Sequence, residues 1–330
     1  MDTLLQHTAP DAMHNSEERY PPPLCHPDTR KDILAELTTW IKGPAQGESS
    51  ILWLHAPAGH GKSAIMQTVA ELLSSPNGTV AATFFFGRGK GKREQARYLF
   101  PTIAYQLALH IPGLWDCVDH IVLTNPILLL NALKYQMESL IVKAFAALDS
   151  KWETKFPFTV IIDGLDECSN PFSQQLIVEL IGQIVNTRRL PLRFLISSRP
   201  EPHILEVFNR PSIQKITCDR NITRRIGNLS DDYKSRADIK TFLRHGFSEI
   251  YSCKSHLIEK VDGLWPSEAT VQYLCDKSRG QFIYATTVLK FVDNRFRHPG
   301  AQLDIILAAK VIQQKNMFSD LDLIYFQILS

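Results

Sequence analysis

The sequence lacks the features that mark several large classes of protein. Its 330 residues contain no apolar run of the ~18 residues that a membrane span needs, and its start lacks the basic-then-apolar pattern of a secretory signal. Its six cysteines form no CxxC pair and no zinc-ligand spacing. With 36 basic and 34 acidic residues the net charge is +2, which gives no reason to expect binding to nucleic acid or membrane. We therefore expect a cytoplasmic protein with reduced thiols.

The residues that are present have the composition of an ordinary globular protein, with 44% apolar and 21% charged residues. Residues 1–24 are polar and end in the proline run Tyr20–Leu24, which marks a boundary. Short apolar runs then predict buried strands at 51–55, 80–86, 158–162, 192–196 and 213–218. Because these strands are almost wholly apolar and alternate with helical patterns, they indicate a parallel sheet covered on both faces.

Helical periodicity fills the rest of the chain. It predicts helices at 31–41, from Lys62 to about residue 73, and at 99–110, 133–148, 176–185, 237–251, 268–277, 282–294 and 303–312. After about Arg220 the strand signals stop. We therefore divide the chain into a polar segment (1–24), an α/β domain (25–220) and a helical subdomain (221–330).

The most informative motif is the Ala-Pro-Ala-Gly-His-Gly-Lys-Ser run at 56–63, which fits the P-loop, or Walker A, pattern with alanine at the first glycine. A strand precedes it and a helix follows it. Backbone N–H groups at the start of such a helix bind phosphate, and Gly59 and Gly61 permit the backbone angles that this loop needs. Lys62 would reach the β- and γ-phosphates, and Ser63 would offer its hydroxyl to Mg²⁺. We assign nucleotide binding to Ala58, Gly59, His60, Gly61, Lys62 and Ser63.

A second motif, of the Walker B kind, ends the third predicted strand with Asp163-Gly164-Leu165-Asp166-Glu167. The carboxyl end of a buried strand is where open α/β sheets bind ligands. Asp163 would hold Mg²⁺, mostly through water, and Glu167 could polarise the attacking water. Asp166 could share the metal-side role. The alternative for both Asp166 and Glu167 is a solvated acid that caps the next helix.

A third motif follows the fourth predicted strand, which ends in Ser197, Ser198 and Arg199. Arg199 would lie beside the γ-phosphate and report its presence, the alternative being a surface arginine in a turn. The glycine- and lysine-rich stretch 87–93 also follows a strand. No helix opens directly from it, so we expect a mobile basic loop rather than a second phosphate loop.

Together these motifs resemble a NACHT domain, and more narrowly the nucleotide-binding module of fungal NLR-like proteins. These belong to the STAND class of P-loop NTPases and are grouped with nephrocystin-3-like N-terminal domains. Stretches at 25–30, 84–86, 100–107 and 280–285 are also similar to the family. The resemblance implies a three-layer sandwich with strand order 5-1-4-3-2 and an ATP/ADP-driven switch that self-associates on activation. It further implies that Thr29 and Arg30 approach the adenine side.

Two features depart from the family pattern. Gly280-Gln281-Phe282 stands where related NTPases often have Gly-x-Pro, which leaves contact with the base open. The sequence also stops at Ser330 inside a helical pattern. We therefore expect a truncated helical subdomain, with effector and ligand-sensing domains in a longer protein.

The motifs and the resemblance predict a signalling switch that binds ATP, or GTP, and hydrolyses it slowly with Mg²⁺. Three rival functions use a similar nucleotide site. A turnover motor of the AAA+ or helicase type would need a substrate-gripping element, and a small-molecule kinase would need a lid; neither is evident. A scaffold that binds nucleotide without hydrolysis would use the same P-loop and Asp163, so the sequence does not separate it from a switch.

Overall fold

The structure is a computed structural model that describes residues 1–43, 49–74, 78–148, 157–186, 190–222, 231–258 and 265–312. The chain divides into two compact units that do not follow sequence order. The first unit, called here the sheet unit, comprises Met1–Leu24, Asp32–Pro57 and Lys62–Ile222. The second, called the helical unit, comprises Cys25–Lys31, Ala58–Gly61 and Thr223–Ser330.

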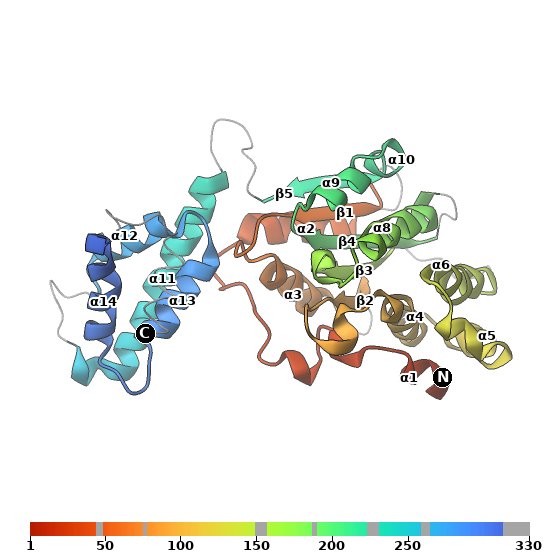
Figure 1. The fold of residues 1–330 in the computed structure, drawn as a ribbon, viewed down its shortest axis with the longest axis horizontal. Coiled ribbons are helices and arrows are strands. Elements are labelled where there is room, and N and C mark those ends of the chain that lie inside the picture. Colours follow the sequence, from red (N-terminus) through yellow and green to blue (C-terminus); the bar gives the residue numbers. More distant parts are fainter. Residues whose placement is uncertain are drawn as a thin grey trace. The chain divides into compact units, whose positions relative to one another are not determined.

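The centre of the sheet unit is a five-stranded sheet in which all neighbouring strands run parallel (Figure 1). Its strands are β1 Ile51–His55, β2 Val80–Phe85, β3 Phe158–Asp163, β4 Leu192–Ser198 and β5 Thr217–Asn221. They lie in the order β2-β3-β4-β1-β5. This is the predicted 5-1-4-3-2 order counted from the opposite edge, so the predicted α/β fold is confirmed.

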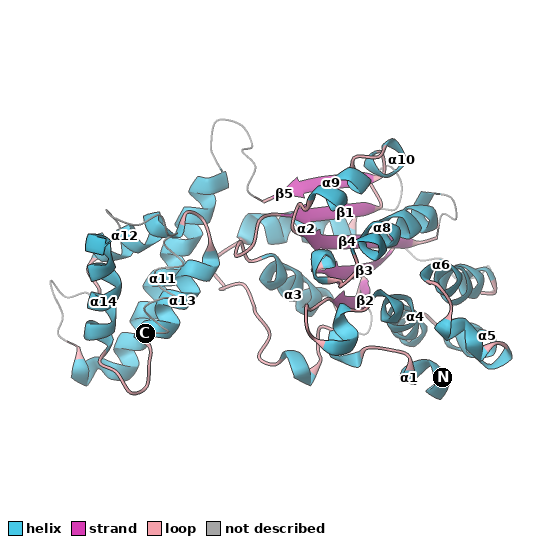
Figure 2. Cartoon of the chain, viewed as in Figure 1, coloured by secondary structure: helices cyan, strands magenta, loops and turns pink. Residues whose placement is uncertain are grey.

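Helices lie on both sides of this sheet, as Figure 2 shows. The α-helices of the unit are α1 Asp2–Gln6, α2 Lys31–Lys42, α3 Lys62–Leu73, α4 Leu99–His110, α5 Leu114–Thr124, α6 Leu133–Met137, α7 Ala144–Ala146, α8 Pro171–Asn186, α9 Pro202–Phe208 and α10 Pro211–Gln214. The 3₁₀-helical segments are η1 Pro10–Ala12, η2 Glu17–Arg19, η3 Gly91–Glu94, η4 Ala96–Tyr98, η5 Pro126–Leu130 and η7 Leu165–Glu167, and η6 Glu138–Lys143 is π-helical. Strands β1, β2 and β4 are buried along their whole length, which is why they are mostly apolar in the sequence, although β4 also buries Arg193 and ends in two serines.

Three of the differences between the predicted elements and the structure have a clear physical reason or consequence. The fifth strand was placed at 213–218 but begins at Thr217, because Pro211 starts the short helix α10, a first-turn position that favours proline. The helix predicted at 133–148 is interrupted by the π-helical segment η6. Helix α5 was not predicted, and it buries Val118 and Val122 in the core.

The N-terminal segment, predicted only as polar, packs against the sheet unit. Its apolar residues Leu4, Ala9 and Ala12 are fully buried, and the Ala9 N–H donates to the Thr102 hydroxyl at 2.9 Å. These burials and several long-range hydrogen bonds, including those of His14, Arg19 and Lys92, therefore hold a segment whose composition is mostly polar.

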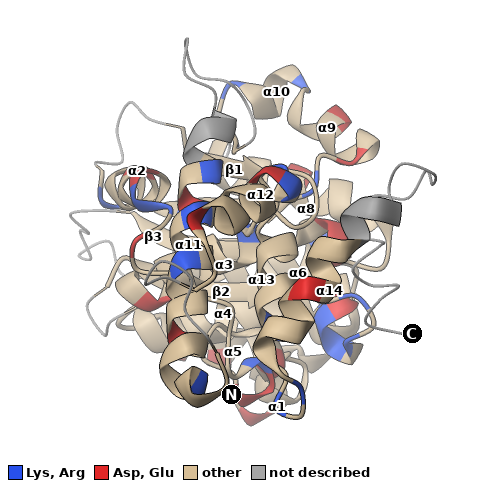
Figure 3. Ribbon diagram, turned by 90° about the vertical axis from the view of Figure 1, so that its left-hand side faces the viewer, with Lys and Arg blue, Asp and Glu red and all other residues tan. Residues whose placement is uncertain are grey.

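The helical unit consists of α11 Asp231–Lys254, η8 Ser255–Leu257, α12 Glu268–Ser278, α13 Phe282–Val292 and α14 Pro299–Ile312. Its core includes Leu243, Phe247, Leu274 and Val288. Both signs of charge occur on α11 and α12 (Figure 3). No helix within the described ranges is long and apolar enough to cross a membrane.

Candidate functional site at the carboxyl edge of the sheet

The three predicted motifs follow strands that end at the same edge of the sheet. The 56–61 loop leaves β1, Asp163 ends β3, and Arg199 follows β4. His55 is paired with Ser198 at the ends of β1 and β4, which fixes these two ends side by side. Parallel strands direct the loops after them to one edge, where α/β proteins bind ligands.

Lys62 is the first residue of α3, and its side chain turns back toward the loop before it. Its ammonium group donates to the carbonyl oxygen of Ala56 at 2.8 Å and to that of Pro57 at 3.1 Å. Burial lowers the pKa of Lys62, and the negative charges of Asp166 and Asp163 oppose that shift. The lysine is thus a partly desolvated cation held at the N-terminus of a helix, which is a favourable place for an anion.

Asp163 is almost completely buried, with 4% of its surface exposed. Its Oδ1 accepts a hydrogen bond from the Ser197 hydroxyl, and Ser63 also bonds to the carboxylate. Burial raises the pKa of Asp163, while these two hydrogen bonds oppose the rise. Ser63 and Asp163, the two predicted metal ligands, are therefore brought together. Ser197 joins them, although the sequence motif indicated nothing for it beyond a small polar side chain.

Asp166 is buried and binds Arg199 through both carboxylate oxygens. Oδ1 accepts the Arg199 backbone N–H at 2.8 Å, and Oδ2 lies 3.2 Å from the Arg199 Nε. Asp166 is therefore not the solvated acid of the second alternative. It fixes the arginine that follows the neighbouring strand β4, a pairing that neither motif predicted by itself.

Glu167 is half-buried and is held by the loop that follows β2. Its Oε2 accepts the Arg88 backbone N–H at 3.2 Å, and the Arg88 guanidinium donates to the Asp166 carbonyl at 3.2 Å. Burial raises the pKa of Glu167, and the hydrogen bond from Arg88 opposes the rise. The basic stretch 87–93 is thus tied to the acidic motif and contains the short turn η3; it does not open a helix as a phosphate loop does.

Arg30 and His60 lie in the helical unit and contact each other. The Arg30 guanidinium donates to the His60 carbonyl at 3.0 Å and to the Ser235 hydroxyl at 3.2 Å, and its backbone N–H donates to Asp238 at 3.1 Å. Thr29 is buried, and its hydroxyl donates to the His26 carbonyl at 2.9 Å. Arg30 therefore hydrogen-bonds to the loop at His60, whereas Thr29 stabilises the turn that precedes Arg30.

Of the two loop glycines, Gly59 has less room for a side chain than Gly61. It has a φ of +79°, and its carbonyl accepts the Ile283 backbone N–H at 3.2 Å. A Cβ on Gly59 would lie 2.5 Å from the Ile283 Cγ2, closer than carbon atoms can approach. The residues after Gly280-Gln281 thus contact the loop directly, a contact that the sequence did not indicate.

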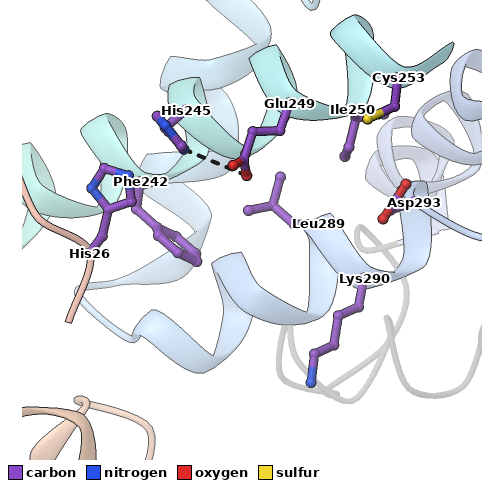
Figure 4. Close-up of a pocket in the computed structure, with 10 residues that line it drawn as sticks. His26, Phe242, His245, Glu249, Ile250, Cys253, Leu289, Lys290 and Asp293 are labelled. Atoms are coloured by element: carbon purple, nitrogen blue, oxygen red, sulfur yellow. Dashed lines mark ion pairs between the residues drawn. The ribbon is translucent and has the colours of Figure 1, made fainter. Parts of the chain in front are cut away.

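A separate hollow of about 260 Å³ lies within the helical unit (Figure 4). The rings of His26 and His245 pack edge to face there with centroids 4.4 Å apart, and His245 Nδ1 lies 3.6 Å from Glu249. None of the residues predicted to bind nucleotide lines it.

We next consider which of the described residues could bind a metal ion. Among residues that the structure describes, no group of three or more His, Cys, Asp and Glu could hold a metal ion. Mg²⁺ does not need such a cluster, because it commonly takes one or two protein ligands and completes its shell with water and substrate phosphates. The hydroxyl of Ser63 hydrogen-bonded to the carboxylate of Asp163 fits that requirement.

The parallel sheet with its motif-bearing carboxyl edge defines a P-loop-like α/β protein. A family model described as nephrocystin 3, N-terminal, matches residues 28–199, more than half of the chain. The chain belongs to this family, and the predicted family is confirmed. The match includes every residue that the sequence placed in the site. No curated protein matches the chain significantly.

Proposed function

We propose that this chain is the nucleotide-binding module of a signalling switch, which binds ATP or GTP with Mg²⁺ and hydrolyses it slowly. The proposal depends mainly on one observation: Lys62, Ser63 and Asp163 lie together at the edge of a parallel sheet. There the N-terminus of a helix, a partly desolvated cation and a buried carboxylate are close to one another. Family membership supports it. Cytoplasmic location, self-association on activation, and separate effector and sensing domains belong to the same proposal.

Each residue has a distinct role in this proposal. The N–H groups of 58–61 bind phosphate oxygens, and the Lys62 ammonium exchanges its two carbonyl partners for the β/γ-phosphates. Ser63 and Asp163 hold Mg²⁺, which when bound neutralises charge on the phosphates. Glu167 orients the attacking water. Arg199, already fixed by Asp166, senses the γ-phosphate.

A nucleotide-binding scaffold without hydrolysis is the second candidate, and one observation favours it. An oxygen of Glu167 accepts the backbone N–H of Arg88, which restrains the side chain that would orient a water. Binding needs Lys62, Ser63 and Asp163, but not Glu167. The two candidates therefore differ only in turnover and share the same binding site.

The Lys62→Ala variant tests the shared part of the proposal. We expect its affinity for nucleoside triphosphate to fall at least about tenfold, since a hydrogen bond to a charged group contributes about 1.5–3 kcal/mol. Lys90→Ala is the matched control: Lys90 is exposed on the basic stretch after β2, and its loss should leave affinity unchanged. Titration with a fluorescent nucleotide, beside circular dichroism of each variant, measures both. Unchanged affinity in folded Lys62→Ala would refute the P-loop assignment.

A further inference from the structure

Arg19, in the N-terminal segment, lies against the sheet unit in an environment unusual for a cation. Its Nη2 donates to the Gln67 Oε1 at 2.7 Å, and its guanidinium carbon lies 3.5 Å from the centroid of the Phe85 ring. Its Nη1 is buried and has no hydrogen-bond partner among the described groups. A buried donor without an acceptor lowers the stability of the folded state. Packing alone therefore does not explain why Arg19 is buried here.

Both groups that hold Arg19 adjoin the predicted metal ligands. Phe85, at the end of β2, is the direct register partner of Asp163, at the end of β3. Gln67 follows Ser63 by four positions on α3, which places the two residues on one face of the helix. Gln67 is itself fixed, because its Nε2 donates to the His14 carbonyl at 2.8 Å and to Glu71 at 3.0 Å.

The electrostatic environments of Arg19 and Asp163 are consistent with Arg19 lying near the predicted metal ligands. Burial lowers the pKa of Arg19 to about 10; the negative charges of Asp163 and Glu71 oppose that shift, and the positive charge of Arg93 adds to it. Burial raises the pKa of Asp163, and the positive charges of Arg19 and Lys62 oppose that rise. Lys62 is the cation that the P-loop pattern assigns to phosphate. Arg19 is an additional cation that no motif accounts for, contributed by a segment outside the α/β pattern.

We propose that Arg19 is an internal counter-cation that competes with Mg²⁺ for the Asp163 carboxylate, so that the N-terminal segment sets the metal dependence of nucleotide binding. The inference rests on the proposed function, since it concerns the same metal site. A fixed positive charge beside a carboxylate weakens the binding of a second cation there by Coulomb repulsion. By linkage, a bound metal must weaken the hold on Arg19 to the same extent.

The test is a Mg²⁺ titration of fluorescent nucleotide binding by the full chain, repeated in EDTA. In Arg19→Gln we expect the Mg²⁺ concentration for half-maximal binding to fall about threefold or more, from loss of one partly screened charge. Binding in EDTA should not change, and Arg19→Lys, which keeps the charge, should behave as wild type. An unchanged or higher Mg²⁺ requirement in folded Arg19→Gln would overturn the inference. Absence of nucleotide binding by the wild-type chain would instead refute the proposed function.

Lys92→Gln separates the charge of Arg19 from the anchoring of its segment. Lys92 Nζ donates to the carbonyls of Gln6 and Thr8, so this variant loosens the same segment and leaves Arg19 in place. Its Mg²⁺ requirement should equal that of wild type, and a shift as large as that of Arg19→Gln would overturn the inference.

A second measurement needs no variant and no activity. Trypsin cleavage after Arg19 of the wild-type chain should be faster with Mg²⁺ and nucleotide than with nucleotide in EDTA, because metal binding weakens the hold on Arg19. Equal cleavage rates at saturating metal would overturn the proposed competition.

Discussion

Asp163 and Glu167 are acidic residues of one motif, yet their surroundings differ. Asp163 is buried and accepts hydrogen bonds from Ser197 and Ser63, whereas Glu167 is half-buried and accepts a backbone N–H from the loop after β2. The first arrangement fixes a carboxylate beside a hydroxyl, as metal binding requires. The second leaves a carboxylate with a raised pKa near the surface, which suits a group that polarises water.

We therefore predict opposite effects for two isosteric variants. Asp163→Asn should weaken Mg²⁺-dependent nucleotide binding and leave binding in EDTA nearly unchanged. Glu167→Gln should spare binding and lower hydrolysis by about 10²–10⁴-fold, the usual contribution of general acid–base catalysis. Equilibrium titration and phosphate release on the same preparations measure the two effects. Equal loss of binding in both variants would show that this division of roles is wrong.

Two glycines of the loop offer a comparison of steric and conformational effects. Gly59 and Gly61 have φ values of +79° and +82°, so alanine at either should cost about 1–2 kcal/mol from backbone strain. Only at Gly59 does the added Cβ also collide with another residue, the β-branched Ile283; nothing lies within 4 Å at Gly61. We predict a larger fall in melting temperature for Gly59→Ala than for Gly61→Ala, measured by circular dichroism. An equal fall would mean that Ile283 moves aside at little cost.

Among individual residues, the sequence could predict those that belong to a short motif contiguous in the chain. The loop at 56–63 and Asp163 follow from motifs that are contiguous in the chain. The bond between Asp166 and Arg199 depends on how β3 and β4 pair, and Arg19 is brought to Gln67 across 48 positions. Such contacts are set by the tertiary arrangement, and no pattern within one segment could have indicated them.

At the scale of elements, continuous apolar composition predicted four of the strands well, because a sheet covered on both faces needs apolar residues at every position. The fifth strand is different. β5, at one edge of the sheet, has the sequence Thr-Cys-Asp-Arg-Asn and is only partly buried, whereas β2 at the opposite edge is buried along its whole length. An edge strand with polar residues carries little apolar signal, so the prediction was drawn to the neighbouring Ile213 and Ile216 and began too early.

The pair α11 and α12 carries a pH-dependent prediction. Glu268, at the first position of α12, lies 3.1 Å from Arg244 Nε and 2.7 Å from Lys240 Nζ on α11. Hydrogen bonds from Arg244 and Lys240 lower the pKa of Glu268 from 4.5 to about 2. Because the folded-state pKa is depressed, the stabilisation is fully present above pH 4.5 and is lost as the pH falls toward 2.

Glu268→Gln should therefore lower the melting temperature at pH 7 by a few degrees at most, as expected for exposed ion pairs. The difference from wild type should shrink below pH 4.5 and vanish near pH 2. Glu249→Gln is the control: Glu249 is an exposed acid on α11 whose partner is His245, and its loss should matter less. A difference that persists unchanged at low pH would show that Glu268 acts through packing or helix capping rather than charge.

At the scale of the whole molecule, the question is whether the arrangement suits a switch or a motor. A motor must complete its chemistry quickly, and in related P-loop enzymes an arginine that reaches the γ-phosphate raises the rate by ~10³–10⁵. In the described part of the sheet unit, three arginines around the acidic motif already have partners, and a fourth, Arg19, is held by Gln67 and the Phe85 ring. Arg199 binds Asp166, Arg88 binds the Asp166 carbonyl, and Arg93 donates to the Phe85 carbonyl.

An arginine that already has a partner can position or sense a phosphate. It must break its hydrogen bond or ion pair, however, before it can stabilise the transition state of hydrolysis. We therefore predict that the purified chain binds Mg-ATP but turns over far below the ~10 s⁻¹ typical of enzymes, and below about one per second. Steady-state phosphate release, compared with equilibrium binding on the same preparation, measures this. Lys62→Ala, prepared identically, gives the background from contaminating ATPases. Turnover of several per second by a monomer would favour a motor, because a switch must keep each nucleotide state long enough for a partner to respond to it.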